Sequence, residues 1–286
     1  QYLVYLSTWT VQAHRSLIDS VSVGTTESFV PSETHFSPFT HVAIYARSSL
    51  AEQTTPALIA IDDLDASVLH LTFTDKDLDA SEIGGGIRWS PASGAARYRV
   101  EHYRVVMASN AEGLNSAEVE LVEAGTHSVN LPVDTPLAER TRVLVYARSQ
   151  LVEQTTPVSK ELFDTTSSVS GLTFKDEDLD AGDLGGDVFW TEPMDIGQVT
   201  HYAVYLAESS SGTGRLLLGK SFTTNVSSTV NASNSSVEIP ADSFHVPADT
   251  STASFLHVLV YTASSFAEQT TPEFHSIIDD SASVSA

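Results

Sequence analysis

The chain has 286 residues, no cysteine, and 14 basic against 37 acidic side chains, which gives a formal net charge of −23. This charge argues against nucleic acid or an anionic membrane surface as a partner and favours cations. The lack of cysteine excludes disulfides, zinc thiolate sites and cysteine nucleophiles. No apolar stretch approaches the roughly 18 residues of a membrane-spanning helix, so we expect no membrane insertion in this segment.

Two phrases recur along the chain. A phrase that ends in Glu-Gln-Thr-Thr-Pro occupies Tyr45–Pro56, Tyr146–Pro157 and Tyr261–Pro272. A second phrase, which contains Asp-Leu-Asp and ends in Trp, occupies Leu71–Trp89 and Leu172–Trp190. The period of about one hundred residues lets each copy enclose a core of its own, unlike the shorter units of a solenoid.

The repeats predict a tandem array of domains. We expect a partial unit over residues 1–64, complete units over 65–165 and 166–280, and the start of a further unit or a linker over 281–286. Tyr2 aligns with Tyr103, so the first unit lacks its two opening strands. We therefore interpret the chain as a window on a longer array.

The missing strands predict an open face on the first unit. Tyr2, Val4 and Leu6 alternate as an inward stripe, and without the opening strands this stripe would be an exposed apolar edge. We expect it to be covered by strands upstream in the chain or by strands from a neighbouring copy, with head-to-tail assembly in either case.

Alternation of apolar side chains with a period of two predicts the strands of the second unit. In chain order they lie near residues 68–73, 86–90 and 103–107, followed by a variable strand, a strand that ends at Leu131-Pro132, and strands near 143–147 and 158–163. Val143, Val145 and Ala147 share one face, which we expect to point into the core. No helical pattern of ten residues competes with these strands, and seven short strands of this kind are typical of a Greek-key sandwich.

Several residues resemble a fibronectin type III domain. The second strand contains Trp89, and the third contains a Tyr-x-Val motif that begins at Tyr103. A Leu-Pro-x-Asp-Thr motif begins at Leu131 at the end of the fifth strand, and a Val-x-Val-x-Ala motif begins at Val143 on the sixth. The repeated phrases also resemble long tandem fibronectin-like repeat proteins predicted in dinoflagellate-type protists. The resemblance implies an all-β array of Greek-key sandwiches of the fibronectin type III or immunoglobulin-like class, arranged as beads on a string, and it implies architecture more than activity.

Acidic residues follow the first strand of each complete unit in an Asp-x-Asp-x-Asp pattern. In the resembling fold this loop, the end of the fifth strand and the end of the last strand lie at the pole that faces the next domain. The carboxylates expected there are Asp75, Asp77, Asp79, Glu82, Asp134 and Asp164 in the second unit, and Asp176, Asp178, Asp180, Asp183, Asp249 and Asp279 in the third. Because Ca²⁺ takes six to eight oxygen ligands, these sets predict Ca²⁺ at the poles between domains. The alternative is a solvated acidic surface that keeps the array soluble and blocks edge pairing.

The Glu-Gln-Thr-Thr-Pro phrase is expected in a loop at the opposite pole, facing the preceding domain. Its identical repetition favours a structural joint between domains over an adhesive peptide. The third unit also carries an insertion between Leu206 and Val246 with three glycosylation acceptors, Asn225, Asn231 and Asn234. These acceptors predict N-linked glycans and an extracellular or cell-surface location.

No catalytic motif is present, and the ten histidines are scattered singly, so we expect no enzyme. The sequence favours a structural repeat segment of an extracellular filament or cell-surface coat, with copies of itself or neighbouring repeats as partners. An adhesion or carbohydrate-binding ectodomain that recognises its ligand through loop tips is the alternative. A recognition protein would be expected to vary its loop tips between units, whereas here the tips are the most repetitive part.

Overall fold

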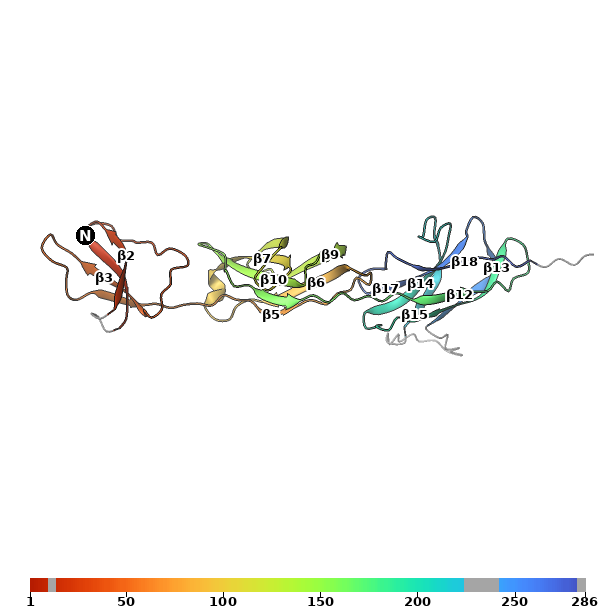
Figure 1. The fold of residues 1–286 in the computed structure, drawn as a ribbon, viewed down its shortest axis with the longest axis horizontal. Coiled ribbons are helices and arrows are strands. Elements are labelled where there is room, and N and C mark those ends of the chain that lie inside the picture. Colours follow the sequence, from red (N-terminus) through yellow and green to blue (C-terminus); the bar gives the residue numbers. More distant parts are fainter. Residues whose placement is uncertain (10–13, 224–241, 282–286) are drawn as a thin grey trace, which may run out of the picture.

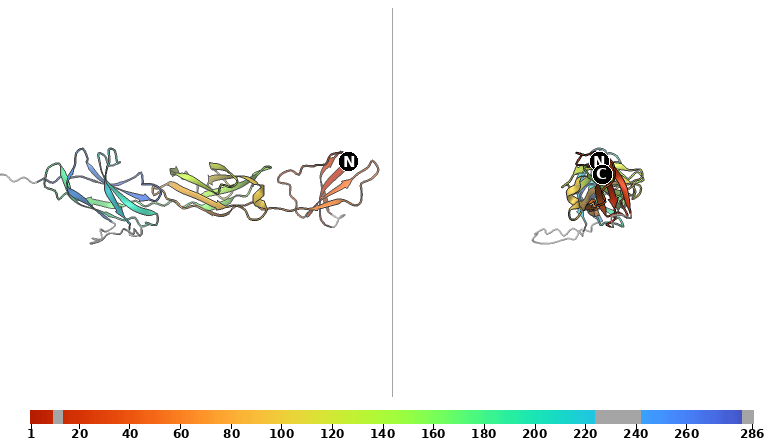
Figure 2. Two further views of the ribbon diagram at one scale, coloured as in Figure 1. Left: turned by 180° about the vertical axis from the view of Figure 1, so that it is seen from behind. Right: turned by 90° about the vertical axis from the view of Figure 1, so that its left-hand side faces the viewer.

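A computed structural model describes residues 1–9, 14–223 and 242–281, and its regular structure is almost entirely antiparallel β-strand. Three bodies follow one another in a row along the chain (Figure 1). Seen end-on, they lie behind one another in a narrow profile (Figure 2). The arrangement is an extended tandem array.

The second unit contains two sheets. One has the order β5-β6-β9, formed by Leu69–Thr72, Glu82–Ser90 and Ser128–Pro136. The other has the order β11-β10-β7-β8, formed by Val158–Glu161, Arg142–Ser149, Val100–Ala108 and Ala117–Glu123. A short 3-10 helix, η1 (Ala96–Arg99), precedes β7.

The third unit repeats this plan. Its three-stranded sheet has the order β12-β13-β16, formed by Ser170–Phe174, Asp183–Thr191 and Ser243–Ser251. Its four-stranded sheet has the order β15-β14-β17-β18, formed by Leu216–Phe222, Val199–Ala207, His257–Ser264 and Glu273–Ser276. The predicted fold class, an all-β array of sandwiches, is confirmed by these paired sheets.

Apolar residues of the two sheets meet in one core per complete unit, as their alternation requires. Val143, Val145 and Ala147 of β10 are buried in the second unit. The Trp89 and Tyr103 rings meet edge to face with their centroids 5.6 Å apart, and Trp190 and Tyr202 make the same contact at 5.3 Å in the third unit. The aromatic pair therefore links the two sheets at the same place in both sandwiches.

Strand β6 begins four residues earlier than the alternation predicts, because a bulge interrupts the pattern. Its register against β9 shifts between Ile83 and Gly85. Gly85 has a φ of 140°, and a Cβ at this position would lie 2.8 Å from the carbonyl oxygen of Thr74. Only glycine fits this backbone, and the strand continues beyond it to the acidic pole.

The described residues of the first unit form one sheet, in the order β2-β1-β3-β4, from Arg15–Val21, Tyr2–Ser7, His41–Ala46 and Ala57–Ala60. The predicted exposure of the inner stripe is wrong for Val4 and Leu6, each of which is only 5% exposed. The segment after β2 faces this stripe, since Thr25–Ser28 lines a cavity of about 300 Å³ together with Val4 and Ile44. Coverage is incomplete, because Ile44 remains 42% exposed whereas Val145 and Val260 at the same repeat position are buried.

Candidate functional site at the joint between units

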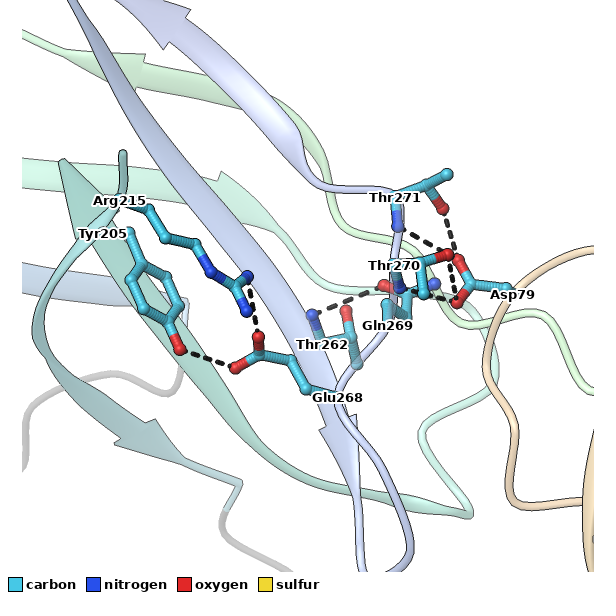
Figure 3. A network of polar contacts seen from close by, with 8 residues as sticks. All are labelled: Asp79, Tyr205, Arg215, Thr262, Glu268, Gln269, Thr270 and Thr271. Atoms are coloured by element: carbon cyan, nitrogen blue, oxygen red, sulfur yellow. Dashed lines mark hydrogen bonds and ion pairs between the residues drawn. The ribbon is translucent and has the colours of Figure 1, made fainter. Parts of the chain in front are cut away.

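Two repeated loops meet between the second and third units. The acidic loop of the second unit, residues 75–81, contacts the Gln-Thr loop of the third unit, residues 264–272, which contains the Glu-Gln-Thr-Thr-Pro phrase (Figure 3). We call this contact the joint. It places the Gln-Thr loop at the pole that faces the preceding domain, as predicted.

The acidic loop owes its shape to its own carboxylates. The Oδ1 atom of Asp75 accepts the amide of Asp77 at 3.1 Å, and the Oδ1 atom of Asp77 accepts the amide of Asp79 at 3.1 Å. Such bonds between a side chain and the backbone two residues ahead are the Asx turns that Asp favours in loops. The alternation of Asp therefore winds the loop in a fixed conformation and brings Asp79 to its tip.

Asp75 and Asp164 fasten the loop to its own unit. Asp75 also accepts the amides of Gly84 at 2.9 Å and Thr165 at 2.8 Å, and Asp164 accepts the amide of Ser81 at 2.8 Å. Burial raises the pKa of Asp75 to about 6 against the opposing effect of these amide donors. Asp75 thus connects the acidic loop to β6 and to Thr165, and Asp164 connects Ser81 to the segment that follows β11.

Asp79 makes the principal polar contact across the joint. Its Oδ2 atom accepts the amide of Thr270 at 2.7 Å and the hydroxyl of Thr270 at 3.1 Å. Its Oδ1 atom accepts the amide of Thr271 at 3.3 Å and also the hydroxyl of that residue. One carboxylate therefore receives four hydrogen bonds from the two threonines (Figure 3).

Leu78 makes the apolar contact. Its side chain is 2% exposed and belongs to the core cluster of the third unit, with Val169 and Val199. Its carbonyl oxygen accepts the amide of Ser167 at 3.2 Å. A leucine of one unit is thus part of the core of the next, so the two units do not bury their apolar surface independently.

Lys76 and Phe266 extend the joint on one side. The hydroxyl of Ser264 donates to the carbonyl oxygen of Lys76 at 2.7 Å, and the ammonium of Lys76 donates to the hydroxyl of Ser265 at 3.0 Å. The Phe266 ring lies so close to Gly84 that a Cβ there would be 3.1 Å from it. The absence of a side chain at Gly84 lets the two units approach.

The remaining polar side chains of the Gln-Thr loop are occupied within the chain. Gln269 accepts the amide of Thr262 at 3.4 Å and donates to the carbonyl oxygen of Leu78 at 2.8 Å. Glu268 accepts the Tyr205 hydroxyl at 2.9 Å and pairs with Arg215 at 2.9 Å (Figure 3). Glu52 pairs with Arg15 in the first unit and Glu153 with Arg104 in the second. The glutamate of the phrase therefore holds the loop against its own sheet in each unit.

The boundary between the first and second units gives an internal comparison. Gln154 donates to the Ser67 hydroxyl at 3.2 Å, as Gln269 does to Ser168 at 2.9 Å. The described part of the first unit offers no acidic loop, and a cavity of about 380 Å³ lies beside Thr155 and Thr156. The Gln-Thr loop therefore forms without its acidic partner, and the joint adds the contacts of Leu78 and Asp79.

Four of the six carboxylates predicted at this pole come together. Ligand atoms of Asp77, Asp79, Glu82 and Asp134 all lie within 4.8 Å of one another. Burial and the neighbouring carboxylates raise the pKa of Glu82 and of Asp134. Oxygen atoms this close suit a hard cation such as Ca²⁺, whereas Asp75 and Asp164 stand outside the group and bind backbone amides.

The acidic pole of the third unit has the same internal bonds. Asp176 accepts the amides of Asp178 and Gly185 at 3.1 and 3.0 Å, and Asp178 accepts the amide of Asp249 at 2.8 Å. These backbone donors lower the pKa of Asp178. Within the described residues, no group at ligand distance forms from the second predicted set, which comprises Asp176, Asp178, Asp180, Asp183, Asp249 and Asp279.

The leucine of the acidic loop was not among the residues predicted to act at the joint. Leu78 and Leu179 stand between two aspartates in a loop, where an apolar residue has no local partner, and their repetition was the available signal. The predicted glycosylation acceptors Asn225, Asn231 and Asn234 lie outside the described residues.

Two paired sheets in each complete unit and a shared joint define a tandem array of β-sandwiches of the fibronectin type III or immunoglobulin-like class. Among solved structures, the chain is similar to chicken CNTN1 FN1–FN3 domains, with 12% identity over 98% of this chain and 91% of that one and a TM-score of 0.34. It is also similar to domains A168–A170 from titin, with 12% identity over 96% and 88% of the two chains and a TM-score of 0.26. No family model and no curated protein matches the chain. Among the described residues, no helix has the length and apolar character needed to cross a bilayer.

Proposed function

We propose that this chain is a structural repeat segment of an extracellular filament or cell-surface coat, in which the joint holds consecutive sandwiches in line. The supporting observation is the contact that the Gln-Thr loop of the third unit makes with the preceding unit. In the third unit, Thr270 and Thr271 bind Asp79 of the preceding unit, while Glu268 and Gln269 hold the loop in place. A loop used in this way is a connector, and its repetition along the chain then follows from its role.

Adhesion or carbohydrate binding is the second candidate function. A recognition loop needs side chains free to reach a ligand, whereas the four polar residues of the phrase in the third unit all have partners within the chain. The proposed role needs no catalytic group. The neighbouring repeats and other copies of the chain are its proposed partners.

An extracellular location and glycans are part of the proposal, and they rest on the three acceptor sequences of the insertion. Ca²⁺ remains a prediction for the carboxylate group of Asp77, Asp79, Glu82 and Asp134, where it would offset the repulsion of four acids. The resemblance to repeat proteins of dinoflagellate-type protists also stays a prediction.

Small-angle X-ray scattering of the full chain, together with negative-stain microscopy of native material, tests the proposal. We expect a rod of constant length for the second and third units, and native fibres with a regular axial repeat. Replacing Asp79 by Ala should broaden the distribution of lengths, and replacing Asp180 by Ala is the matched control. Flexible beaded monomers, with no difference between the two variants, would favour the recognition role instead.

A further inference from the structure

The acidic loop of the third unit, residues 176–182, presents the same side chains as the loop that forms the joint. Leu179 and Asp180 stand at the repeat positions of Leu78 and Asp79. Leu78 is 2% exposed, whereas Leu179 is 60% exposed. An apolar side chain that is buried in one copy of a motif and exposed in another marks a surface that a partner can cover.

This loop already has the conformation that the joint uses. Asp176 and Asp178 accept backbone amides just as Asp75 and Asp77 do, and Asp279 accepts the amide of Gly182 at 2.8 Å, as Asp164 accepts that of Ser81. Binding would therefore cost little ordering of the loop, because its backbone is fixed in advance.

The carboxylate of Asp180 completes the correspondence. Its counterpart Asp79 accepts four hydrogen bonds from Thr270 and Thr271, whereas no donor to the Asp180 carboxylate is found in the part of the chain that the structure describes. A partner that matches this surface must supply paired threonine amides and hydroxyls, and an apolar cavity for a leucine beside them.

The repeat itself contains that partner surface. The second unit carries the same loop chemistry at its other pole, where Val100, Ala147, Thr155 and Thr156 line a cavity of about 380 Å³. Glu33, Asp63 and Leu64 of the first unit line the same cavity from the other side. In the third unit the equivalent place holds Leu78 in contact with the core. The third unit therefore shows that a complete unit of this repeat accepts a leucine in its core and an aspartate at its threonines, as Leu179 and Asp180 require.

We propose that the acidic loop of the third unit is a docking surface for one more complete unit of this repeat, which buries Leu179 and binds Asp180 through its Gln-Thr loop. The inference rests on the proposed structural function and names the partner of a specific pole. The proposed contact repeats an interface already present between the second and third units, and its threonine donors complement the carboxylate.

The test uses the full chain extended after residue 280 by a second copy of residues 166–281. Hydrogen exchange is measured at Thr270 and Thr271 of the appended copy. We expect the exchange rate of these amides to be lower by about tenfold or more than in the same chain carrying Leu179→Asp or Asp180→Ala. Amides of the appended core strands report that the copy is folded in every variant.

A second extended chain has residues 65–164 appended instead. It is used if the appended copy of residues 166–281 does not fold. There the exchange of Thr155 and Thr156 in the appended copy should respond to Leu179→Asp and Asp180→Ala in the same way. Asp79→Ala is the internal control, because it should act on the original joint only. If the appended loops exchange freely while the original joint stays protected, this inference is wrong and the proposed function stands. If the original joint is unprotected as well, both fail.

Discussion

Replacing Asp79 by Ala tests whether the joint is an energetic connection. The variant removes the acceptor of four hydrogen bonds from Thr270 and Thr271. A hydrogen bond to a charged group contributes about 1.5–3 kcal/mol, and bonds that share one carboxylate do not add. We therefore expect the joint to lose about 3 kcal/mol, or roughly a hundredfold in the equilibrium between its closed and open forms.

Hydrogen exchange at the Thr270 and Thr271 amides measures this loss directly, since both amides donate to Asp79. In Asp79→Ala their exchange should accelerate about a hundredfold, while the amides of β13 and β14 keep their rates. Asp180→Ala removes the same side chain from the third unit's own pole and should leave Thr270 and Thr271 unchanged. Equal exchange in the two variants would refute the reasoning, because Asp79 would then be a surface acid without a role in the joint.

Four further outcomes are expected. Leu78→Ala should lower the free energy of unfolding of the third unit by about 2–4 kcal/mol, whereas Leu179→Ala should change it by less than about 0.5 kcal/mol; similar effects in chemical denaturation would contradict the buried role of Leu78. Ca²⁺ should raise the melting temperature and a chelator should reverse it, with Asp134→Asn losing the response and Asp249→Asn retaining it; calorimetry without heat of binding speaks against the site. Amides of β1 and β3 should exchange faster than those of β7 and β10, because the described first unit has one sheet; equal protection would mean that its cover is as stable as a second sheet. Intact mass before and after an N-glycosidase should differ in secreted protein, and an unchanged mass would remove the glycan evidence for secretion at Asn225, Asn231 and Asn234.

The sequence by itself determined the repeat, the strands and the pole on which each loop lies. Period-two alternation of apolar side chains predicts that one face of a strand is buried, so Val143, Val145 and Ala147 could be assigned to the core from the sequence alone. The equal spacing of the two phrases predicted that the two acidic loops would have the same backbone conformation, and their matching hydrogen bonds confirm it. Strand ends were less well determined, since the bulge at Gly85 depends on how the chain passes the carbonyl oxygen of Thr74.

Only the tertiary structure decided which members of the repeated sets act together. Six acids of the second unit looked equivalent in sequence, yet Asp75 and Asp164 bind backbone amides while Asp79 crosses to the next unit. Leu78 and Leu179 share a motif, but only the former meets a core. The reason is physical: burial and hydrogen bonding depend on what lies opposite a side chain, and Thr270, which binds Asp79, is 191 residues further along the chain.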